Sequence, residues 1–317
     1  MIITVTMNPA LDKTAEAASI KPGGLNRLDN IEIDAGGKGV NVSKTIKALG
    51  GETVATGFLG GGAGREIEAA LRRLNIATDF IAVGHTTRTN LKILSGDYGI
   101  TEFNEPGAEI SPGEMAALYD KLTGYAAPGA IFVFAGSLPR GAGAGSYRVL
   151  INAVREKGAA VFLDTDGAAF GAALAAAPDY IKPNKFELSQ YFGKSEDISA
   201  GECVSLCDAL IGRGIRTVAL SMGAQGALFV TRGEKLFAPG LPVRALSTVG
   251  AGDAMTGALA YAFDRGMGFR DAAVLAMAVS AGAVTTKGTK PPDRATVEAL
   301  KPLVIISDIK NKNAHFF

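Results

Sequence analysis

Short apolar runs alternate along the chain with longer segments of helical periodicity. The apolar runs cover residues 2–6, 53–58, 130–135, 159–163, 180–181 and 217–221, and the helical segments cover residues 40–49, 66–74, 113–122, 146–157, 185–192 and 200–212. Such alternation is typical of parallel strands joined by crossover helices. The runs are continuously apolar, as expected of strands covered by helices on both faces. The pattern predicts an α/β fold, a doubly wound sandwich around a mostly parallel sheet.

Two stretches, residues 25–34 and 89–103, depart from this rhythm. Polar and apolar residues alternate in both, and a turn at residues 95–99 divides the second stretch. Alternation is typical of antiparallel strands with one solvated face. We therefore expect an antiparallel flap at the edge of the main sheet. An isolated small sheet would expose an apolar face, which a second subunit could cover.

Composition and charge limit the class of protein. The chain has 317 residues, 47% of them hydrophobic, which suffices for one large α/β domain or two small ones. The 32 Lys and Arg residues balance 31 Asp and Glu residues, and no basic block occurs. This balance argues against nucleic acid or an anionic membrane surface as the main partner, whereas a small anionic substrate needs only a few local cations.

We expect neither a membrane span nor a signal peptide. The longest apolar run, residues 272–284, is shorter than the ~20 residues that a span requires, so it predicts a buried helix. Residues 1–6 follow a strand pattern and lack a basic leader. The two cysteines, Cys203 and Cys207, are four residues apart on a predicted helix and are interpreted as buried apolar residues. Nothing in this pattern implies a disulfide, so we expect a cytoplasmic protein.

The segment TVGAGD, residues 248–253, carries the strongest chemical signal because its glycine-rich turn opens directly into an apolar helix. The first N–H groups of a helix lack intrahelical partners and, with the helix dipole, bind anions. Asp253 would lie beside a phosphate bound there, where a carboxylate could take a proton from an attacking hydroxyl. A simple capping role is the structural alternative for Asp253. The chain has only two histidines, His85 and His315, so a histidine-dependent triad is not expected.

Two further polar turns precede predicted helices. The segment DAGGKGVN, residues 34–41, supplies backbone donors, the cation Lys38 and the amide of Asn41, which suit sugar hydroxyls or a phosphate. A glycine turn with a solvated lysine is the alternative. In KPNKFE, residues 182–187, Asn184 and Glu187 share one helix face. They could hold waters of a hydrated Mg²⁺, or they could form a capping box.

The remaining glycine-rich turns carry weaker signals. SMGAQGAL, residues 221–228, predicts a tight turn between two strands whose backbone donors could face a nucleotide. GFLGGGAG, residues 57–64, fits the dinucleotide-binding fingerprint poorly, because the expected acid at the end of the next strand is missing. The sequence contains no Walker-type phosphate loop.

Taken together and in this order, the motifs resemble those of the ribokinase-like carbohydrate kinases, also called the phosphofructokinase-B family. NPALD at residues 8–12 and GSLP at residues 136–139 complete the set, which spans nearly the whole chain. Within the family the chain is most similar to kinases of fructose 1-phosphate, and next to kinases of tagatose 6-phosphate. The supporting stretches are residues 4–12, 57–61, 87–93 and 101–107. Two positions depart from this pattern. The kinases that the chain resembles often have a Pro or a Lys at the position of Arg140, and often a Pro at the position of Ala108.

The resemblance implies an ATP-dependent kinase, using Mg²⁺, that converts fructose 1-phosphate to fructose 1,6-bisphosphate. It also implies one ribokinase-like domain over residues 1–317, with a small β-sheet lid of about residues 12–34 and 87–107. Family members often dimerise through this lid, so we expect a homodimer. The alternatives are a tagatose-6-phosphate kinase or a 6-phosphofructokinase, a kinase of an unphosphorylated sugar or nucleoside, and a sugar- or nucleotide-binding protein without turnover. Lys38 and Arg88 argue against a neutral acceptor, which does not need two cations.

The resemblance also assigns roles to individual residues. Asp253 would deprotonate the acceptor hydroxyl, and the amides of Gly250, Ala251 and Gly252 would stabilise charge on the γ-phosphoryl group. The nucleotide site would contain Lys182, Asn184, Glu187, Ser221, Gly223, Gly226 and Thr248, with Asn184 and Glu187 reaching Mg²⁺ through water. The sugar phosphate site would contain Asp12, Gly37, Lys38, Asn41, Arg88, Arg27 and Lys92, with Lys38 and Arg88 on the phosphate.

Overall fold

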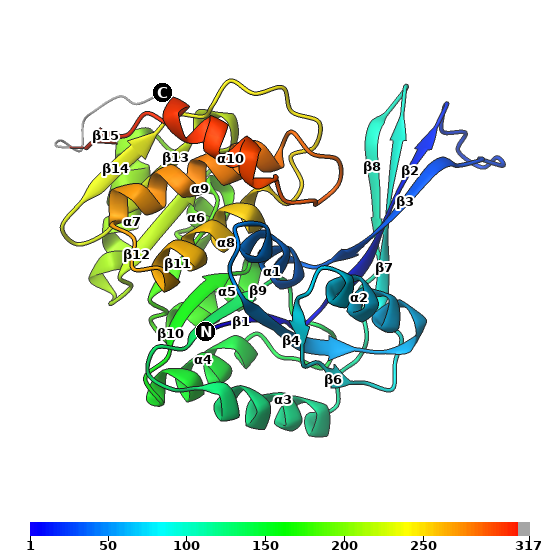
Figure 1. Cartoon of the computed structure of the whole chain (residues 1–317), viewed down its shortest axis with the longest axis horizontal. Coiled ribbons are helices and arrows are strands. Elements are labelled where there is room, and N and C mark those ends of the chain that lie inside the picture. The colour runs from blue at the N-terminus through cyan, green and yellow to red at the C-terminus, as the bar shows by residue number, and fades with distance from the viewer. Residues whose placement is uncertain (310–317) are drawn as a thin grey trace.

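The main sheet of the computed structural model, which describes residues 1–309, contains eleven strands (Figure 1). Its parallel part contains β1 (Ile2–Thr6), β4 (Thr53–Leu59), β5 (Ala77–Thr78), β6 (Ile81–Ala82), β9 (Ile131–Ala135), β10 (Ala160–Asp164), β11 (Tyr180–Ile181) and β12 (Thr217–Ser221). Three antiparallel strands extend one edge: β13 (Ala227–Val230), β14 (Lys235–Ala238) and β15 (Ser307–Asp308). The sheet order around the centre, β10-β9-β1-β4, places the carboxyl ends of these strands together.

Helices cover both faces of this sheet, so the predicted sandwich is confirmed. One face packs on α3 (Pro112–Tyr125), α4 (Ser146–Glu156), α5 (Gly167–Leu174), α6 (Lys185–Tyr191) and α7 (Ala200–Gly212). The other face packs on α1 (Lys38–Ala48), α8 (Ala251–Asp264), α9 (Phe269–Ala283) and α10 (Arg294–Leu300). Neighbouring residues of one strand point to opposite cores, as Ile2 and Ile3 do in β1. This explains why the strands are continuously apolar.

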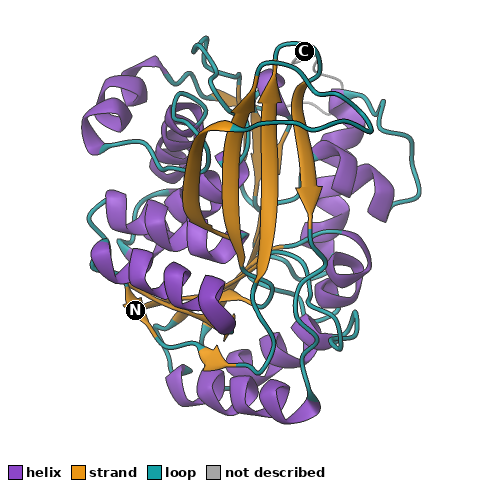
Figure 2. Ribbon diagram, turned by 90° about the vertical axis from the view of Figure 1, so that its right-hand side faces the viewer, coloured by secondary structure: helices purple, strands orange, loops and turns teal. Residues whose placement is uncertain are grey.

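A second sheet forms the lid, in the order β3-β2-β7-β8. Its strands are β2 (Ala10–Ala17), β3 (Asp29–Gly36), β7 (Arg88–Ser95) and β8 (Gly99–Asn104), and α2 (Gly61–Arg73) packs at its base. The sheet projects away from the helices of the main body in Figure 1 and lies in front of them in Figure 2. The antiparallel expectation was wrong for the central pair, because β2 and β7 run parallel. Residues 25–28 lie outside the strands, β2 was not predicted, and neither was α5.

The two faces of the lid differ in chemistry, as the strand register shows. Asp34, Asp12, Asn90 and Asn104 stand opposite one another on one face, and Ile33, Lys13, Leu91 and Phe103 on the other. Asp12 and the neighbouring Lys92 are only 7% exposed, whereas Ile33 is 46% and Phe103 56% exposed. The polar face is therefore turned toward the body of the protein, and the apolar face toward solvent.

Other expectations concern single segments. Residues 272–284 lie almost entirely in α9, which is largely buried, and Cys203 and Cys207 are free and buried on α7. Both expectations are confirmed. Within residues 1–309, no helix combines the length and apolarity needed to cross a membrane. His315 lies outside the described residues.

Candidate active site

The TVGAGD segment forms the turn that begins α8. Gly250 is the N-cap residue and has φ 85°, a left-handed conformation that glycine adopts without strain. α8 starts at Ala251, so the amides of residues 251–253 belong to its first turn and need partners outside the helix. Gly250, not Asp253, is the N-cap, and Asp253 is an acid of the first turn. Its side chain also accepts a hydrogen bond from Asn41 on another helix, so a local role at the helix start does not account for it alone.

A cavity of about 470 Å³ opens in front of this turn. Charged side chains line one end, including Lys38, Asp164, Glu187 and Asp253. The lining is apolar elsewhere, with Leu241, Val243, Met255, Met277 and Val284. A cavity with an anion-binding helix terminus, cations and an apolar wall suits a nucleotide, whose phosphates and base need these two environments.

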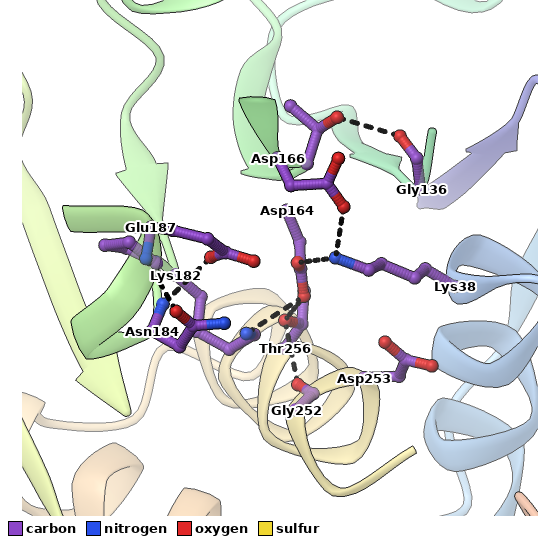
Figure 3. A network of polar contacts seen from close by, with 12 residues as sticks. Lys38, Gly136, Asp164, Asp166, Lys182, Asn184, Glu187, Gly252, Asp253 and Thr256 are labelled. Carbon is purple, nitrogen blue, oxygen red and sulfur yellow. Dashed lines mark hydrogen bonds and ion pairs between the residues drawn. The ribbon is translucent and has the colours of Figure 1, made fainter. Parts of the chain in front are cut away.

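Three groups surround the carboxylate of Asp164, at the carboxyl end of β10. Lys38 Nζ lies 3.1 Å from its Oδ1, Lys182 Nζ lies 3.2 Å from its Oδ2, and Thr256 donates to Oδ2 at 2.8 Å (Figure 3). We call Asp164, Lys38, Lys182 and Thr256 the charged hub. Burial alone would raise the pKa of Asp164, but the attraction of Lys182 and Lys38 outweighs it and lowers the pKa to about 2. Asp164 is therefore a fixed anion at neutral pH.

Sequence reasoning did not identify Asp164 or Thr256. Asp164 directly follows the predicted strand 159–163, and ligands of open α/β sheets bind beyond the carboxyl ends of the strands. That position was the signal that could have revealed it. Thr256 lies three residues after Asp253, on the first turns of the same helix.

Asp253 is buried beside the hub and receives a hydrogen bond from a different helix. Asn41, on α1, donates from Nδ2 to Oδ2 of Asp253 at 2.8 Å. Burial raises the pKa of Asp253, and so does repulsion from Asp164, to about 6. The Asn41 hydrogen bond and the charges of Lys38 and Lys182 oppose this rise. Asp253 can thus be charged at neutral pH and still accept a proton, as a general base requires.

The capping box predicted for Asn184 and Glu187 is formed at the start of α6. Asn184 Oδ1 accepts from the backbone N–H of Glu187 at 2.7 Å, and Glu187 Oε2 accepts from that of Asn184 at 2.9 Å. Both residues also line the cavity, so the box orients them toward a ligand. Burial raises the pKa of Glu187.

The other residues predicted to bind the nucleotide gather at the same cavity. Ser221, Gly223, Gly226 and Thr248 line it together with Lys182. Ser221 ends β12 and pairs with the segment that carries Asn184, since its N–H donates to the Pro183 carbonyl at 3.0 Å. The motifs of residues 182–187 and 221–228 are therefore neighbours in space.

The base of the lid carries a second set of polar groups, the acceptor face, which comprises Asp12, Arg88, Asn90 and Lys92. Asn90 Nδ2 donates to Asp12 Oδ1 at 2.9 Å, and Lys92 Nζ lies 3.9 Å from Asp12 Oδ2. Arg88 donates to the carbonyls of Glu105 and Asn8, each at 3.1 Å. Asn90 was not among the predicted site residues, although its alternation with Arg88 and Lys92 on one strand places all three on one face.

Several buried polar atoms at the lid base and at Asn41 have no hydrogen-bond partner among residues 1–309. They are Arg88 Nε, Asn90 Oδ1 and Asn41 Oδ1. Buried polar groups are normally hydrogen-bonded, so these atoms are suited to receive a polar ligand.

Three other predicted substrate residues lie in different surroundings. Gly37 is the N-cap of α1 and has φ 104°, with Thr6 and Pro9 packed against it. Arg27 lies in the exposed connection between β2 and β3, and the structure does not bring it to the acceptor face. Lys38 lies in the charged hub, with Asp164 at 3.1 Å and Asp166 at 3.8 Å.

A doubly wound sheet with a helix-terminal anion site, a buried carboxylate and a polar lid defines a phosphotransferase of small polar molecules. The sequence signature described as pfkB family carbohydrate kinase matches residues 5–295, and the chain belongs to this family. The predicted family and ribokinase-like fold are thereby confirmed, and the protein is a carbohydrate kinase.

Individual relatives agree with this assignment. The chain is 39% identical to a 1-phosphofructokinase of Xanthomonas campestris pv. campestris, over 82% of this chain and 83% of the relative. It is 38% identical to a 1-phosphofructokinase of Rhodobacter capsulatus, over 95% of this chain and 99% of the relative. Among solved structures, phosphofructokinase-2 from Escherichia coli in complex with substrates and products superposes with a TM-score of 0.91 at 28% identity. That likeness covers 95% of this chain and 98% of the other.

Proposed function

We propose that the protein transfers the γ-phosphoryl group of ATP to fructose 1-phosphate and forms fructose 1,6-bisphosphate. The observation that carries this proposal is the position of Asp253. Its buried carboxylate lies on the first turn of α8, between the cavity and the amide of Asn41. The relatives named 1-phosphofructokinase, at 38–39% identity over most of the chain, support the choice of acceptor.

ATP would occupy the 470 Å³ cavity with its base against the apolar wall of Leu241, Val243 and Met277. Its phosphates would then extend toward the amides of Gly250, Ala251 and Gly252. Lys182 would sit beside them, since it lines the cavity and lies close to Gly252. Preorganised donors of this kind stabilise the charge that develops on a transferred phosphoryl group.

The cavity also fits Mg²⁺ bound to ATP. Mg²⁺ is held in such sites by one or two carboxylates, substrate phosphates and waters, rather than by a protein cage. Glu187 and Asp164 supply two carboxylates at the charged end, and the described residues contain no cluster of three or more metal-binding side chains. Glu187 and Asn184 would hold Mg²⁺ through its waters. When bound, Mg²⁺ would neutralise part of the phosphate charge.

Asp253 would take the proton from the attacking hydroxyl as that oxygen bonds to the γ-phosphorus, while the bond between the γ-phosphorus and the β–γ bridging oxygen breaks and ADP leaves. Asn41 would hold the carboxylate in position through its 2.8 Å hydrogen bond, and its unpaired Oδ1 could receive a sugar hydroxyl. The ammonium group of Lys38, held by Asp164 at 3.1 Å, would stabilise the negative charge of the phosphoryl group during its transfer. In this proposal Lys38 contacts the transferred phosphate rather than the phosphate already on the sugar.

The acceptor face would bind the sugar phosphate. Asp12 and Asn90 would present a carboxylate and an amide to the hydroxyls. Arg88 and Lys92 would bind the existing phosphate. Lys92 is 7% exposed, and its nearest anionic partner is Asp12, at the long distance of 3.9 Å. An ammonium buried with so weak a partner gains most from an anionic ligand.

An ATP-to-ADP coupled assay with Mg²⁺ tests this function across five acceptors: fructose 1-phosphate, fructose 6-phosphate, tagatose 6-phosphate, fructose and ribose. We expect the highest kcat/KM with fructose 1-phosphate. Preference for another phosphorylated sugar would retain the mechanism and replace the substrate. Turnover of the free sugars alone would remove Arg88 and Lys92 from their roles. Binding without turnover, seen as thermal stabilisation by sugar phosphate, would make the protein a sensor or carrier.

We also propose a homodimer through the apolar face of the lid. Ile31, Ile33 and Phe103 are each at least 46% exposed there, and exposed apolar surface of this kind marks an interface. Light scattering after size exclusion should give twice the 32.5 kDa chain mass, and Ile33→Glu should shift the protein toward monomer. A wild-type monomer at micromolar concentration would refute the dimer.

Because ATP and phosphorylated sugars are metabolites of the cell interior, we assign the enzyme to the cytoplasm, which cell fractionation can test.

A further inference from the structure

Lys44 is a buried cation that the proposed mechanism does not use. It lies on α1, is 6% exposed and does not line the large cavity. Its Nζ donates to the Ala35 carbonyl at 2.8 Å and to Thr289 Oγ1 at 3.3 Å. No carboxylate of the residues described lies within 4.0 Å of it. Burying an ammonium on neutral partners costs stability, so a role of Lys44 in function would account for its position.

The first partner of Lys44 belongs to the turn on the acceptor side. Ala35 is the second-last residue of the lid strand β3, which ends at Gly36, and Gly37 is the N-cap of α1. Gly36 packs so closely on the carboxylate of Asp12 that a Cβ atom added to Gly36 would overlap this carboxylate. Holding the Ala35 carbonyl therefore fixes the backbone on which Asp12 rests, and also the start of the helix that carries Lys38 and Asn41.

The second partner belongs to the turn on the nucleotide side. A Cβ placed on Gly250 would lie 3.3 Å from Cβ of Thr289, so Thr289 packs directly against this left-handed residue. Holding Thr289 Oγ1 therefore fixes the support of the Gly250–Asp253 turn. The two turns are far apart in sequence, and Lys44 contacts a neighbour of each.

We propose that Lys44 is a positioning residue that couples the two turns, so that the acceptor hydroxyl, the transferred phosphoryl group and Asp253 stay aligned. The inference rests on the proposed function and extends it to a residue outside both binding surfaces. Alignment is the main contribution of the protein to phosphoryl transfer, and a displacement of 1 Å can cost about 10²-fold in rate.

Lys44 and Asp253 also interact electrostatically, although Asp164, Lys38 and Lys182 act on the Asp253 carboxylate more strongly. The charged groups that face it are Asp34 on β3, Asp12 on β2, Asp253 on α8 and Lys290 after α9. Burial lowers the pKa of Lys44, and the three carboxylates oppose this effect. The attraction is reciprocal, so removing the Lys44 charge should raise the pKa of Asp253.

The test is Lys44→Met, which keeps the side-chain length and removes the charge and the donors. With fructose 1-phosphate and ATP, we expect kcat to fall by about 10- to 100-fold, with smaller changes in either KM. The acid limb of the pH profile should move to higher pH, a change that a merely structural role would not produce. Lys47→Met is the matched control, since Lys47 is on the same helix in an exposed pair with Glu52 and should leave both readouts unchanged.

A second pair of variants, at Thr289, tests the same proposal if Lys44→Met does not fold. Thr289→Val removes the hydroxyl that accepts from Lys44, and Thr289→Ser keeps it. We expect Thr289→Val to lower kcat and Thr289→Ser to retain it. Folded Lys44→Met with wild-type kcat and pH profile would overturn the proposal, as would equal activity of the two Thr289 variants if Lys44→Met does not fold. A wild-type protein that phosphorylates none of the five acceptors would instead refute the proposed function.

Discussion

The charged hub and the acceptor face are both buried polar clusters, yet they are built in opposite ways. In the hub, Asp164 is satisfied by Lys38, Lys182 and Thr256 at 2.8–3.2 Å without any ligand. On the acceptor face, Arg88 Nε and Asn90 Oδ1 have no partner in the part of the chain that the structure describes, and Lys92 Nζ lies 3.9 Å from Asp12 Oδ2. The hub is complete within the protein, whereas the acceptor face, in the proposed function, would be completed by the sugar phosphate.

This difference matches the role proposed for each region: the hub would stabilise the transferred phosphoryl group, and the acceptor face would select the sugar phosphate. A phosphoryl group in transfer gains most from charges that are already in place, because no energy is then spent on reorganisation. A sugar phosphate is selected by pairing groups that would otherwise remain unsatisfied, and an acceptor that lacks the matching groups leaves them so. Variants of the hub should therefore change stability and kcat, and variants of the acceptor face should change KM for the sugar.

The largest effect should come from Asp253→Asn, beside the charged hub. The amide keeps the shape of the carboxylate and can accept the Asn41 hydrogen bond, but it cannot take a proton. We expect kcat to fall by about 10²- to 10⁴-fold with both KM values nearly unchanged. Asp271→Asn is the control, because Asp271 is an exposed acid in the first turn of α9. Retention of most of the activity would refute Asp253 as the base.

Asp164→Ala should have the next largest effect, and mainly on stability. It leaves Lys38 and Lys182 as close cations without their shared anion. Breaking a buried pair in this way costs about 3–5 kcal/mol of unfolding free energy, measurable by urea denaturation. Asp166→Ala removes a 55% exposed carboxylate 3.8 Å from the same Lys38 and should cost less than about 1 kcal/mol. Equal losses in the two variants would show that the hub is not a stability element.

Arg88→Ala should give the contrasting result. The guanidinium donates to two backbone carbonyls, so its loss should change stability little. A charge-assisted hydrogen bond to the sugar phosphate is worth about 1.5–3 kcal/mol, which corresponds to roughly 10- to 150-fold in kcat/KM. The loss should appear in the KM of fructose 1-phosphate and not in that of ATP, with Arg148→Ala, an exposed substitution on α4, as control. A loss confined to the KM of ATP would move Arg88 to the nucleotide side.

The same contrast explains which parts of the site could be predicted from the sequence. The turn at Gly250 and the capping box of Asn184 and Glu187 are local, since every residue involved lies within a few positions. Asp164 meets Lys38 across 126 positions and Asn90 meets Asp12 across 78, so no local pattern reveals either pair.

The fold was predictable to a similar extent. Continuous apolar runs identified the central strands of the main sheet, because both of their faces are buried. Strand β2 was missed because its residues are mixed in polarity and its parallel partner β7 is distant in sequence. Helix α5 was missed because its sequence, GAAFGAAL, consists almost entirely of glycine and alanine and has little amphipathic periodicity.

The smallest effect should be the dependence of activity on pH. Asp253 must be charged to accept a proton, and burial beside Asp164 raises its pKa to about 6. The charged fraction is therefore nearly complete above this pKa and falls below it, so kcat/KM should drop by up to about tenfold per pH unit at lower pH. Recovery of full activity after return from pH 5 to pH 7.5 would separate titration from unfolding. A flat profile between pH 5 and 8 would contradict the raised pKa. Asp164 and Asp253 repel each other, so the acid limb of the pH profile also depends on the hub. Asp164→Asn should move this limb to lower pH, whereas Arg88→Ala should move it far less.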